Sequence, residues 1–369
     1  MEILRVSGLK KYFPIKKGFF NRTVGQVKAV NDIEFEINAG ETLGLVGESG
    51  CGKSTTGGCI VRLLEPTAGS IRYTSADGRE IDLATAPRDA VRPFRREIQM
   101  VFQDPYSSLN PRMSVRDLVA EPLLINDMIR KEEVQDAVAK MLTRVGLRPE
   151  YMTRYAHAFS GGQRQRIGIA RAISLNPRLV ICDEAVSSLD VSVQGQVLGL
   201  LEDLQAEYHM SYLFIAHDLS AVRHISDRVA VMYVGKVVEI AQTDELFENP
   251  RHPYTEALLG SVPRLVPSKH ARRETLEGEV PDPSNPPEGC FFRPRCKYAT
   301  EDCRRCTQVL QPVGDDPLGH RTSCMRYQEL TLRGVGKHIT VVGPYAPQTA
   351  VALPVNSETP INQKRRGST

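Results

Sequence analysis

The sequence lacks any long hydrophobic run. No stretch approaches the ~18 consecutive apolar residues that a membrane-spanning helix needs, and the start, MEILRVSGLK, lacks the apolar segment of a signal peptide. These absences predict a cytosolic chain whose role at a membrane, if it has one, comes through a partner.

A strong charge of either sign is also missing. The formal net charge is +3 over 369 residues, which is too small to predict binding to nucleic acid. We interpret a local basic cluster, Arg88, Arg92, Arg95 and Arg96, as a solvated face. With 41% apolar and 25% charged residues, the composition is that of a soluble globular protein, and the length predicts roughly two domains.

The stretch TLGLVGESGCGKST has the pattern of a phosphate-binding loop. Thr42–Val46 is a short apolar run typical of a buried strand, and Gly47, Gly52, Lys53 and Ser54 then satisfy G-x-x-x-x-G-K-[ST]. Glycines let backbone N–H groups curl around a phosphate, and the helix expected next points its positive end at the same anion. We therefore expect Lys53 to neutralise phosphate oxygens and the Ser54 hydroxyl to ligate Mg²⁺.

Two adjacent carboxylates end a second buried strand. The run Arg178–Glu184, RLVICDE, delivers Asp183 and Glu184 to the carboxyl end of a strand, where open α/β sheets bind ligands. Adjacent strand residues point to opposite sides, so the two acids can take different roles. Asp183 is predicted to hold Mg²⁺, often through water, and Glu184 to act as the general base on the attacking water.

Two further expected strands lead into polar residues. Gln103 follows the strand Ile98–Phe102, and His217 follows the strand Tyr212–Ala216. A glutamine amide can hold a metal ion or an attacking water, and a histidine can hydrogen-bond a γ-phosphate oxygen. Taken alone, an ordinary loop residue and a structural histidine are the alternatives.

A second anion site is predicted where the run FSGGQRQR enters a helix. Ser160 is placed as the N-cap, Gly161 and Gly162 expose backbone N–H groups, and Gln163 follows in the first turn. A plain capped helix is the alternative, although capping alone does not require two glycines.

An aromatic pair, Tyr12 and Phe13, lies between two expected strands, Ile3–Val6 and Val30–Ile37. Either ring offers the flat face on which a nucleotide base stacks. A core or edge aromatic is the alternative. Further on, Ile71–Leu83 is expected to contain a hairpin.

The composition changes beyond Gly260. A proline-rich stretch, Pro263–Pro287, suits an extended linker, and the end of the chain from Gly334 is expected to be disordered, at least at its terminus. Between them, five of the eight cysteines crowd together with spacings x5, x6, x2 and x17: Cys290, Cys296, Cys303, Cys306 and Cys324. Such crowding in a reducing compartment predicts a metal site, while free cysteines are the alternative.

Taken together, these motifs resemble an ATP-binding cassette subunit. In order they correspond to Walker A at Gly47–Thr55, the Q-loop at Gln103, the signature at Ser160–Gln163, Walker B at Val180–Glu184, a D-loop at Ser187–Asp190 and the switch His217. The segments GESGCGKST, VFQDPYSSLNPRMSV, LDVSVQ and ENPRHPYTEALL are similar to those of the oligopeptide, dipeptide and nickel importer branch.

The resemblance implies an α/β fold of the P-loop NTPase class. It consists of a RecA-like core, an antiparallel β subdomain, a helical subdomain and a small Cys-rich C-terminal region. The expected division is a nucleotide-binding domain at 1–260 with its helical subdomain at about 104–165, a linker and Cys-rich region at 261–333, and a tail at 334–369.

The resemblance also implies the roles of site residues. Glu184, His217 and Gln103 are the expected catalytic residues, and Ser54, Gln103 and Asp183 the expected magnesium ligands. ATP is expected to contact Phe13 (with Tyr12 as the alternative), Gly47, Ser49, Gly50, Cys51, Gly52, Lys53, Ser54, Thr55, Ser160, Gly161, Gly162, Gln163 and Asp190.

By the same resemblance, the protein is a peripheral ATPase on the cytoplasmic side of the membrane. Its expected partners are a second cassette, identical or homologous, two transmembrane permease subunits and, through the permease, an extracytoplasmic solute-binding protein. ATP hydrolysis would energise uptake of di- or oligopeptides, with nickel or another small solute as the alternative.

Two other functions are disfavoured by the sequence. A DNA-repair or translation ATPase is disfavoured because the chain has one GKS, one SGGQ and an insert of normal size between them. A regulatory module with a vestigial cassette is disfavoured because Glu184 is intact.

For the cysteines, the resemblance implies a [4Fe-4S] cluster on Cys290, Cys296, Cys303 and Cys324, with Cys306 spare. All-thiolate ligation equally suits Zn²⁺. Because the cluster lies outside every ATP motif, we expect it to serve stability or subunit docking more than ATP binding.

Two positions depart from the family pattern. Ala185 replaces the proline that usually follows the Walker B glutamate, which frees the backbone locally but leaves both carboxylates in place. Phe159 replaces the leucine common before the signature, a tolerable apolar exchange.

Overall fold

The structure is a computed structural model that describes residues 1–18, 22–104, 106–261, 276, 278–314 and 319–335. The tail expected to be disordered lies outside these residues from 336 onward. Much of the predicted proline-rich linker, 262–275 and 277, also lies outside them.

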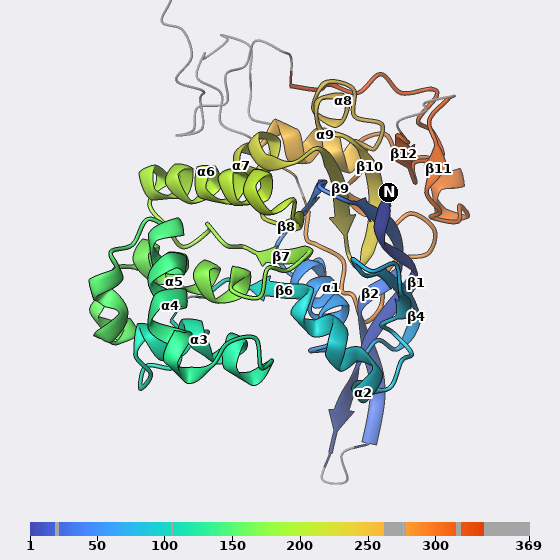
Figure 1. Ribbon diagram of the computed structural model, residues 1–369. Helices are drawn as coiled ribbons and strands as arrows, with labels where there is room; N and C mark the ends of the chain where they lie inside the picture. Colours follow the sequence, from blue (N-terminus) through green and yellow to red (C-terminus); the bar gives the residue numbers. More distant parts are fainter. Residues whose placement is uncertain (19–21, 105, 262–275, 277, 315–318, 336–369) are drawn as a thin grey trace, which may run out of the picture.

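A mixed eight-stranded sheet in the order β11-β12-β10-β9-β3-β8-β7-β6 forms the centre of the fold (Figure 1). Its strands are β3 (Thr42–Val46), β6 (Ile98–Val101), β7 (Leu179–Asp183), β8 (Ser211–Ile215), β9 (Arg228–Tyr233), β10 (Lys236–Gln242), β11 (Gln311–Pro312) and β12 (Arg321–Thr322). The five strands from β9 to β6 pair in parallel. Strands β3, β7, β8 and β9 are buried along their whole length, as their continuous apolar runs predict. Their carboxyl ends meet at one edge, where the predicted site residues follow.

A second sheet is antiparallel, with the order β2-β1-β4-β5. Its strands are β1 (Glu2–Lys17), β2 (Arg22–Asn38), β4 (Ala68–Thr74) and β5 (Glu80–Asp82). The first two strands are much longer than expected and form a projecting hairpin (Figure 1). Tyr12 and Phe13 therefore lie within β1 and not between strands. The apolar sides of both sheets share one core, in which Leu43 and Leu45 of β3 pack with Ile3 and Phe35.

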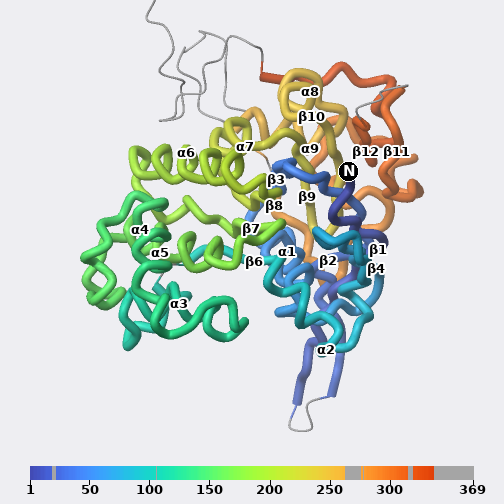
Figure 2. The backbone as a smooth tube through the Cα atoms, viewed as in Figure 1, coloured from blue at the N-terminus to red at the C-terminus, as the bar shows by residue number. Residues whose placement is uncertain are grey.

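Helices cover the remaining faces. They are α1 (Lys53–Ile60), α2 (Arg88–Val91), α3 (Val115–Ile125), α4 (Val134–Arg144), α5 (Gly161–Ile173), α6 (Val191–Tyr208), α7 (Leu219–Ile225), α8 (Thr243–Glu248) and α9 (Pro253–Gly260), with short 3₁₀ turns at Arg92–Arg96, Lys131–Glu133, Pro149–Thr153, Ala156–Ala158, Arg293–Arg295 and Glu301–Arg304. Helices α3, α4 and α5 form a separate lobe beside the sheet edge that carries β6, as both views show (Figures 1 and 2).

The cysteine-rich region is attached directly to the central sheet. Strand β12 pairs with β10, where Glu239 lies opposite Thr322, and β11 continues the pairing beyond it. Val335 is also buried, and its N–H donates to the carbonyl oxygen of Phe247 at 2.6 Å. The cysteine-rich region that the sequence predicted after the linker is thus an extension of the central sheet.

Candidate nucleotide site and cysteine pocket

The phosphate loop connects β3 to α1 and is wedged between two strands. A Cβ atom on Gly47 would lie 2.1 Å from the carbonyl oxygen of Met232 in β9, and one on Gly52 would lie 2.1 Å from that of Ala29 in β2. Both glycines have positive φ, 151° and 110°, which side chains disfavour. The backbone path of the loop is therefore available only with glycine at these two positions.

The Lys53 ammonium lies inside the curve of this loop. Its Nζ donates to the carbonyl oxygens of Gly47 at 2.8 Å and Glu48 at 3.1 Å, and the residue is 5% exposed. Cys51 is buried, and its carbonyl oxygen accepts the N–H of Gly235 at 2.9 Å. Ser49 and Gly50 lie exposed at the rim, and Thr55 is half-buried. The loop thus presents a positive charge and an open rim, a suitable geometry for a polyphosphate.

Two predicted magnesium ligands already touch. The Ser54 hydroxyl in α1 donates to Oδ1 of Asp183 at the end of β7, at 2.8 Å. Burial raises the pKa of the Asp183 carboxyl, partly offset by the Ser54 hydrogen bond. A divalent cation beside this carboxylate would reverse the pKa shift and favour the ionised form, so the pair suits Mg²⁺.

The three predicted catalytic side chains converge on one point. Gln103 Nε2 donates to Glu184 Oε2 at 2.7 Å, and His217 Nδ1 lies 3.4 Å from the same oxygen. Glu184 and His217 line an open cavity of about 290 Å³, so solvent water can reach the carboxylate. Three strands, β6, β7 and β8, deliver these residues to one sheet edge.

The backbone at the Walker B glutamate is fixed even though the usual proline is replaced by Ala185. Glu184 has a φ of 46°, in the left-handed region, and its N–H donates to the carbonyl oxygen of Ile215 at 2.8 Å. Ala185 and Val186 are each 2% exposed. Burial and this hydrogen bond hold the segment, and the left-handed conformation is typical of a functional position.

The aromatic pair divides between two environments. Tyr12 donates its hydroxyl to Asn31 Oδ1 at 2.7 Å, whereas Phe13 is 36% exposed with Lys11 Nζ 4.9 Å from the ring centroid. Tyr12 pairs with Lys28 of β2, the neighbour of Ala29, whose carbonyl lies against Gly52 of the phosphate loop. The more exposed ring of the pair is therefore that of Phe13.

The signature residues and the D-loop lie side by side. Ser160 caps α5, its hydroxyl accepting the Gln163 N–H while its own N–H donates to Gln163 Oε1. A Cβ on Gly162 would lie 2.5 Å from Val193 Cγ1 at the start of α6, whose N-cap is Asp190. Ser160 and Asp190 are both exposed, so this second predicted anion site faces outward.

Sequence reasoning missed the residues that hold the outer side of the phosphate loop. Arg295 makes a bidentate ion pair with Glu48, and the Tyr254 hydroxyl accepts the Glu48 N–H at 2.9 Å. One signal was present, since Arg295 immediately precedes Cys296, one of the clustered cysteines. Its partner could not be identified from spacing, because the two residues are 247 positions apart.

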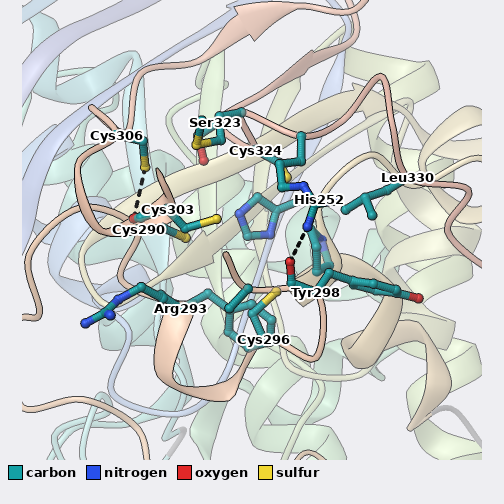
Figure 3. Close-up of a pocket in the computed structure, with 15 residues that line it drawn as sticks. His252, Cys290, Arg293, Cys296, Tyr298, Cys303, Cys306, Ser323, Cys324 and Leu330 are labelled. Carbon is teal, nitrogen blue, oxygen red and sulfur yellow. Dashed lines mark hydrogen bonds between the residues drawn. The ribbon is translucent and has the colours of Figure 1, made fainter. Parts of the chain in front are cut away.

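All five clustered cysteines line one pocket (Figure 3). Burial raises the pKa of the Cys290 and Cys324 thiols to about 12, and neighbouring cysteines add to the shift. Among the described residues, however, no three or more His, Cys, Asp or Glu side chains are placed as a metal site. The predicted ligands are gathered, but they are not preassembled.

The sheet has five parallel strands, with a phosphate loop after β3 and two adjacent acids at the end of β7. Together with the outward-facing capped helix α5, these features define an ATP-binding cassette ATPase. Residues 30–187 match the ABC transporter family, and residues 238–303 match the oligopeptide/dipeptide transporter C-terminal region. The fold is similar to the ATP-binding cassette MJ0796 bound to ADP and phosphate, with TM-score 0.57, 24% identity and coverage of 65% of this chain and 99% of the other.

Relatives define the particular family. The chain is 52% identical to the oligopeptide transport ATP-binding protein AppF of Bacillus subtilis over 88% of this chain and 97% of the relative. It is 51% identical to the dipeptide transport ATP-binding protein DppF of Haemophilus influenzae, over 86% and 95%. The chain belongs to this family of ABC transporter ATPases. No helix among the described residues combines the length and apolar character needed to cross a bilayer.

Proposed function

We propose that this ATPase energises the import of di- and oligopeptides through a membrane permease. The observation that carries the proposal is the identity of about half of all residues, over almost the full length of relatives named for oligopeptide and dipeptide transport. The match of the C-terminal region to the same transporters supports it independently. Nickel or another small solute is the alternative cargo.

We assign the hydrolytic step to the three converging side chains. Glu184 takes the proton of the attacking water, His217 contacts the γ-phosphate, and Gln103 orients the water and contributes to the metal site. Ser54 and Asp183 would hold Mg²⁺, which supplies positive charge to the phosphate oxygens. The 2.7 Å contact between Gln103 and Glu184 supports this assignment, because it joins the segments that follow β6 and β7 by one hydrogen bond.

We place a second cassette against the outward signature. Ser160, Gly161, Gly162 and Gln163 would close on the nucleotide held by the partner's phosphate loop, with Asp190 beside them, so that ATP joins the two cassettes. The exposure of Ser160 and Asp190 supports this arrangement. The permease would dock near the segment after Gln103, at the cytoplasmic face of the membrane, and would link the cassettes to a solute-binding protein outside.

Reconstitution tests the cargo. The chain is purified with its permease and binding protein in lipid vesicles, and ATP turnover is measured with dipeptides, longer peptides, Ni²⁺ or no solute. We expect peptides to stimulate turnover several-fold and Ni²⁺ to leave it at the basal rate. Stimulation by Ni²⁺ alone would establish the other cargo, and turnover stimulated by nucleic acid would exclude a transport role.

We further propose that the cysteine pocket holds a thiolate-bound metal centre, a [4Fe-4S] cluster or Zn²⁺. The donor set supports it: burial raises the pKa of the Cys290 and Cys296 thiols, and backbone N–H groups of Phe292 and Tyr298, two residues later, offset part of this rise, as hydrogen bonds to a metal-bound sulfur would. The buried Nε2 of His252, which also lines the pocket, has no hydrogen-bond partner among the described residues. The cavity is only about 20 Å³, so the thiols must rearrange to hold either group.

Metal analysis of anaerobically purified protein decides between these groups. An iron–sulfur cluster gives a brown protein containing iron and sulfide, whereas zinc gives a colourless one. Substitution by serine of any of Cys290, Cys296, Cys303 and Cys324 is expected to remove the metal, while Cys306→Ser keeps it. Metal-free wild-type protein, as stable as the variants, would exclude both groups.

We retain the division of the chain into a cassette at 1–260, a linker and cysteine region at 261–333, and a tail. The helical subdomain is proposed at about 104–165. The burial of Val335 against Phe247 favours a tail that begins just after this residue.

A further inference from the structure

One acidic residue of the phosphate loop is held by the cysteine-rich region. Glu48 follows the first glycine of the loop, and Arg295 immediately precedes Cys296. Arg295 Nη1 donates to Glu48 Oε2 at 2.7 Å, and Nη2 donates to Oε1 at 3.0 Å. The arginine side chain is 4% exposed and that of the glutamate 24%. A bidentate pair shielded in this way is stronger and better defined than a surface ion pair.

Both partners are fixed by further contacts. Arg295 Nη1 lies 3.3 Å from the Tyr233 hydroxyl at the end of β9, and the Tyr233 ring packs edge-on against Phe292. The Glu48 N–H donates to the Tyr254 hydroxyl, and its carbonyl oxygen accepts a hydrogen bond from Lys53. The N–H, the carbonyl oxygen and the carboxylate of Glu48 are thus each held by a hydrogen bond.

We propose that Arg295 is a positioning residue for ATP binding. By clamping Glu48 it holds the phosphate loop in its curved conformation, so that the cysteine-rich region contributes to nucleotide affinity. The inference rests on the assignment of this loop as the ATP site. It differs from our expectation from sequence that this region serves stability or docking more than ATP binding.

The proposal predicts a change in KM and not in kcat, because of the stages of the reaction at which the loop contacts ATP. A phosphate loop holds the phosphates both in the bound ground state and in the transition state, so loosening it raises KM and leaves kcat nearly unchanged. A merely structural contact would behave differently, because partial unfolding lowers the active fraction at constant KM.

The experiment measures KM and kcat for ATP in the assembled transporter and Kd for MgADP on the full chain. The variants are Arg295→Gln, Glu48→Gln and the double variant. The matched control is Arg304→Gln, which removes the same charge from the same region but breaks exposed pairs with Glu288 and Glu301. We expect Arg295→Gln to raise KM and Kd about tenfold with kcat within about twofold, and the control to match wild type.

The double variant separates positioning from simple electrostatics. It restores the net charge of the wild type but lacks the clamp, so KM and Kd should stay raised by about the same factor. A return to wild-type values would show that the pair acts only through its charges and would overturn the proposal. Unchanged KM and Kd in every variant, with lower kcat and melting temperature, would overturn it as well.

Two controls keep these outcomes interpretable. Glu48→Gln conserves size, so it still tests the clamp, through a raised KM, if Arg295→Gln does not fold. Lys53→Ala tests the ATP site itself. If wild type and Lys53→Ala bind nucleotide equally, the assignment of the loop as the ATP site fails. If Lys53→Ala loses binding, that assignment stands, and the presence or absence of the tenfold rise in KM and Kd in Arg295→Gln then tests the clamp.

Discussion

The nucleotide site and the cysteine pocket differ in how far the fold assembles them. Gln103, Glu184 and His217 follow three neighbouring parallel strands, and their side chains already meet within 3.4 Å. Of the five cysteines only Cys303 lies in a regular element, the 3₁₀ turn Glu301–Arg304, and the other four lie in loops. Among the described residues no metal-binding group is preassembled. A long buried sheet positions catalytic groups through its own packing, whereas a short, loop-rich region needs outside contacts or a bound group to fix its side chains.

The two regions are nevertheless connected. Strand β12 joins the cysteine region to β10 of the central sheet, and Arg295 reaches the phosphate loop. We therefore expect disruption of the nucleotide site to leave the pocket intact, but disruption of the pocket to affect the nucleotide site. This asymmetry can be tested.

The largest effect is expected for Glu184→Gln. The amide keeps the size and the contact with Gln103 but cannot accept a proton, so hydrolysis should fall roughly 10²- to 10⁴-fold while ATP still binds. Phosphate release and nucleotide binding, measured on the same preparation, check this. Metal content should equal that of wild type, and near-normal turnover would remove Glu184 as the base.

A smaller loss is expected for Ser160→Arg, which adds bulk and charge where the partner's nucleotide would dock. ATP binding to the isolated chain should survive, and turnover of the assembly should fall by about tenfold or more. Thr153→Arg, which adds the same charge at an exposed position of the helical lobe, is the control. Loss of binding in the isolated chain would mean that Ser160 belongs to the chain's own site.

The pocket should show a pH dependence that comes from one buried histidine. Burial lowers the pKa of His252 from 6.5 to about 3, and its Nδ1 accepts the Tyr254 N–H at 3.1 Å. Because the unfolded chain binds a proton near pH 6.5 and the folded chain does not, the free energy of unfolding should fall as pH drops from about 6.5 to about 3.

His252→Asn tests this linkage, since the asparagine oxygen can still accept the Tyr254 N–H. Denaturant unfolding at several pH values should give a shallower decline for the variant across the same range. Parallel curves for wild type and variant would show that other groups cause the acid sensitivity.

The sequence predicted those parts of the fold that depend on local pattern. Apolar runs followed by polar residues correctly placed Gln103 and His217 after sheet strands and Asp183 at the end of one, because burial on both faces requires continuous apolar runs and ligands gather at the carboxyl ends. The long β1–β2 hairpin was underestimated, since Pro14 and Gly25 disfavour strands and only pairing between the two strands compensates.

Contacts between distant segments could not be predicted. Nothing in the spacing of Arg295 identifies Glu48 as its partner, and nothing around His252 indicates that its ring lines the cysteine pocket. Both depend on how the cysteine-rich region is attached to the sheet, where β12 pairs with β10. The two-residue strands that form this pairing are too short to give a pattern in the sequence.

The smallest effect should distinguish Phe13 from Tyr12 at the nucleotide site. Stacking of a base on an aromatic ring is worth ~1 kcal/mol, so Phe13→Ala should raise KM for ATP about fivefold, with kcat unchanged because the base does not react. Tyr12→Phe removes only the hydrogen bond to Asn31 and should leave KM near the wild-type value. Phe13→Ala should raise KM for GTP by a similar factor, since stacking needs only a flat face on the base. If Tyr12→Ala raised KM and Phe13→Ala did not, the exposed ring would not be the stacking residue, and β1 would have to present its other face to the base.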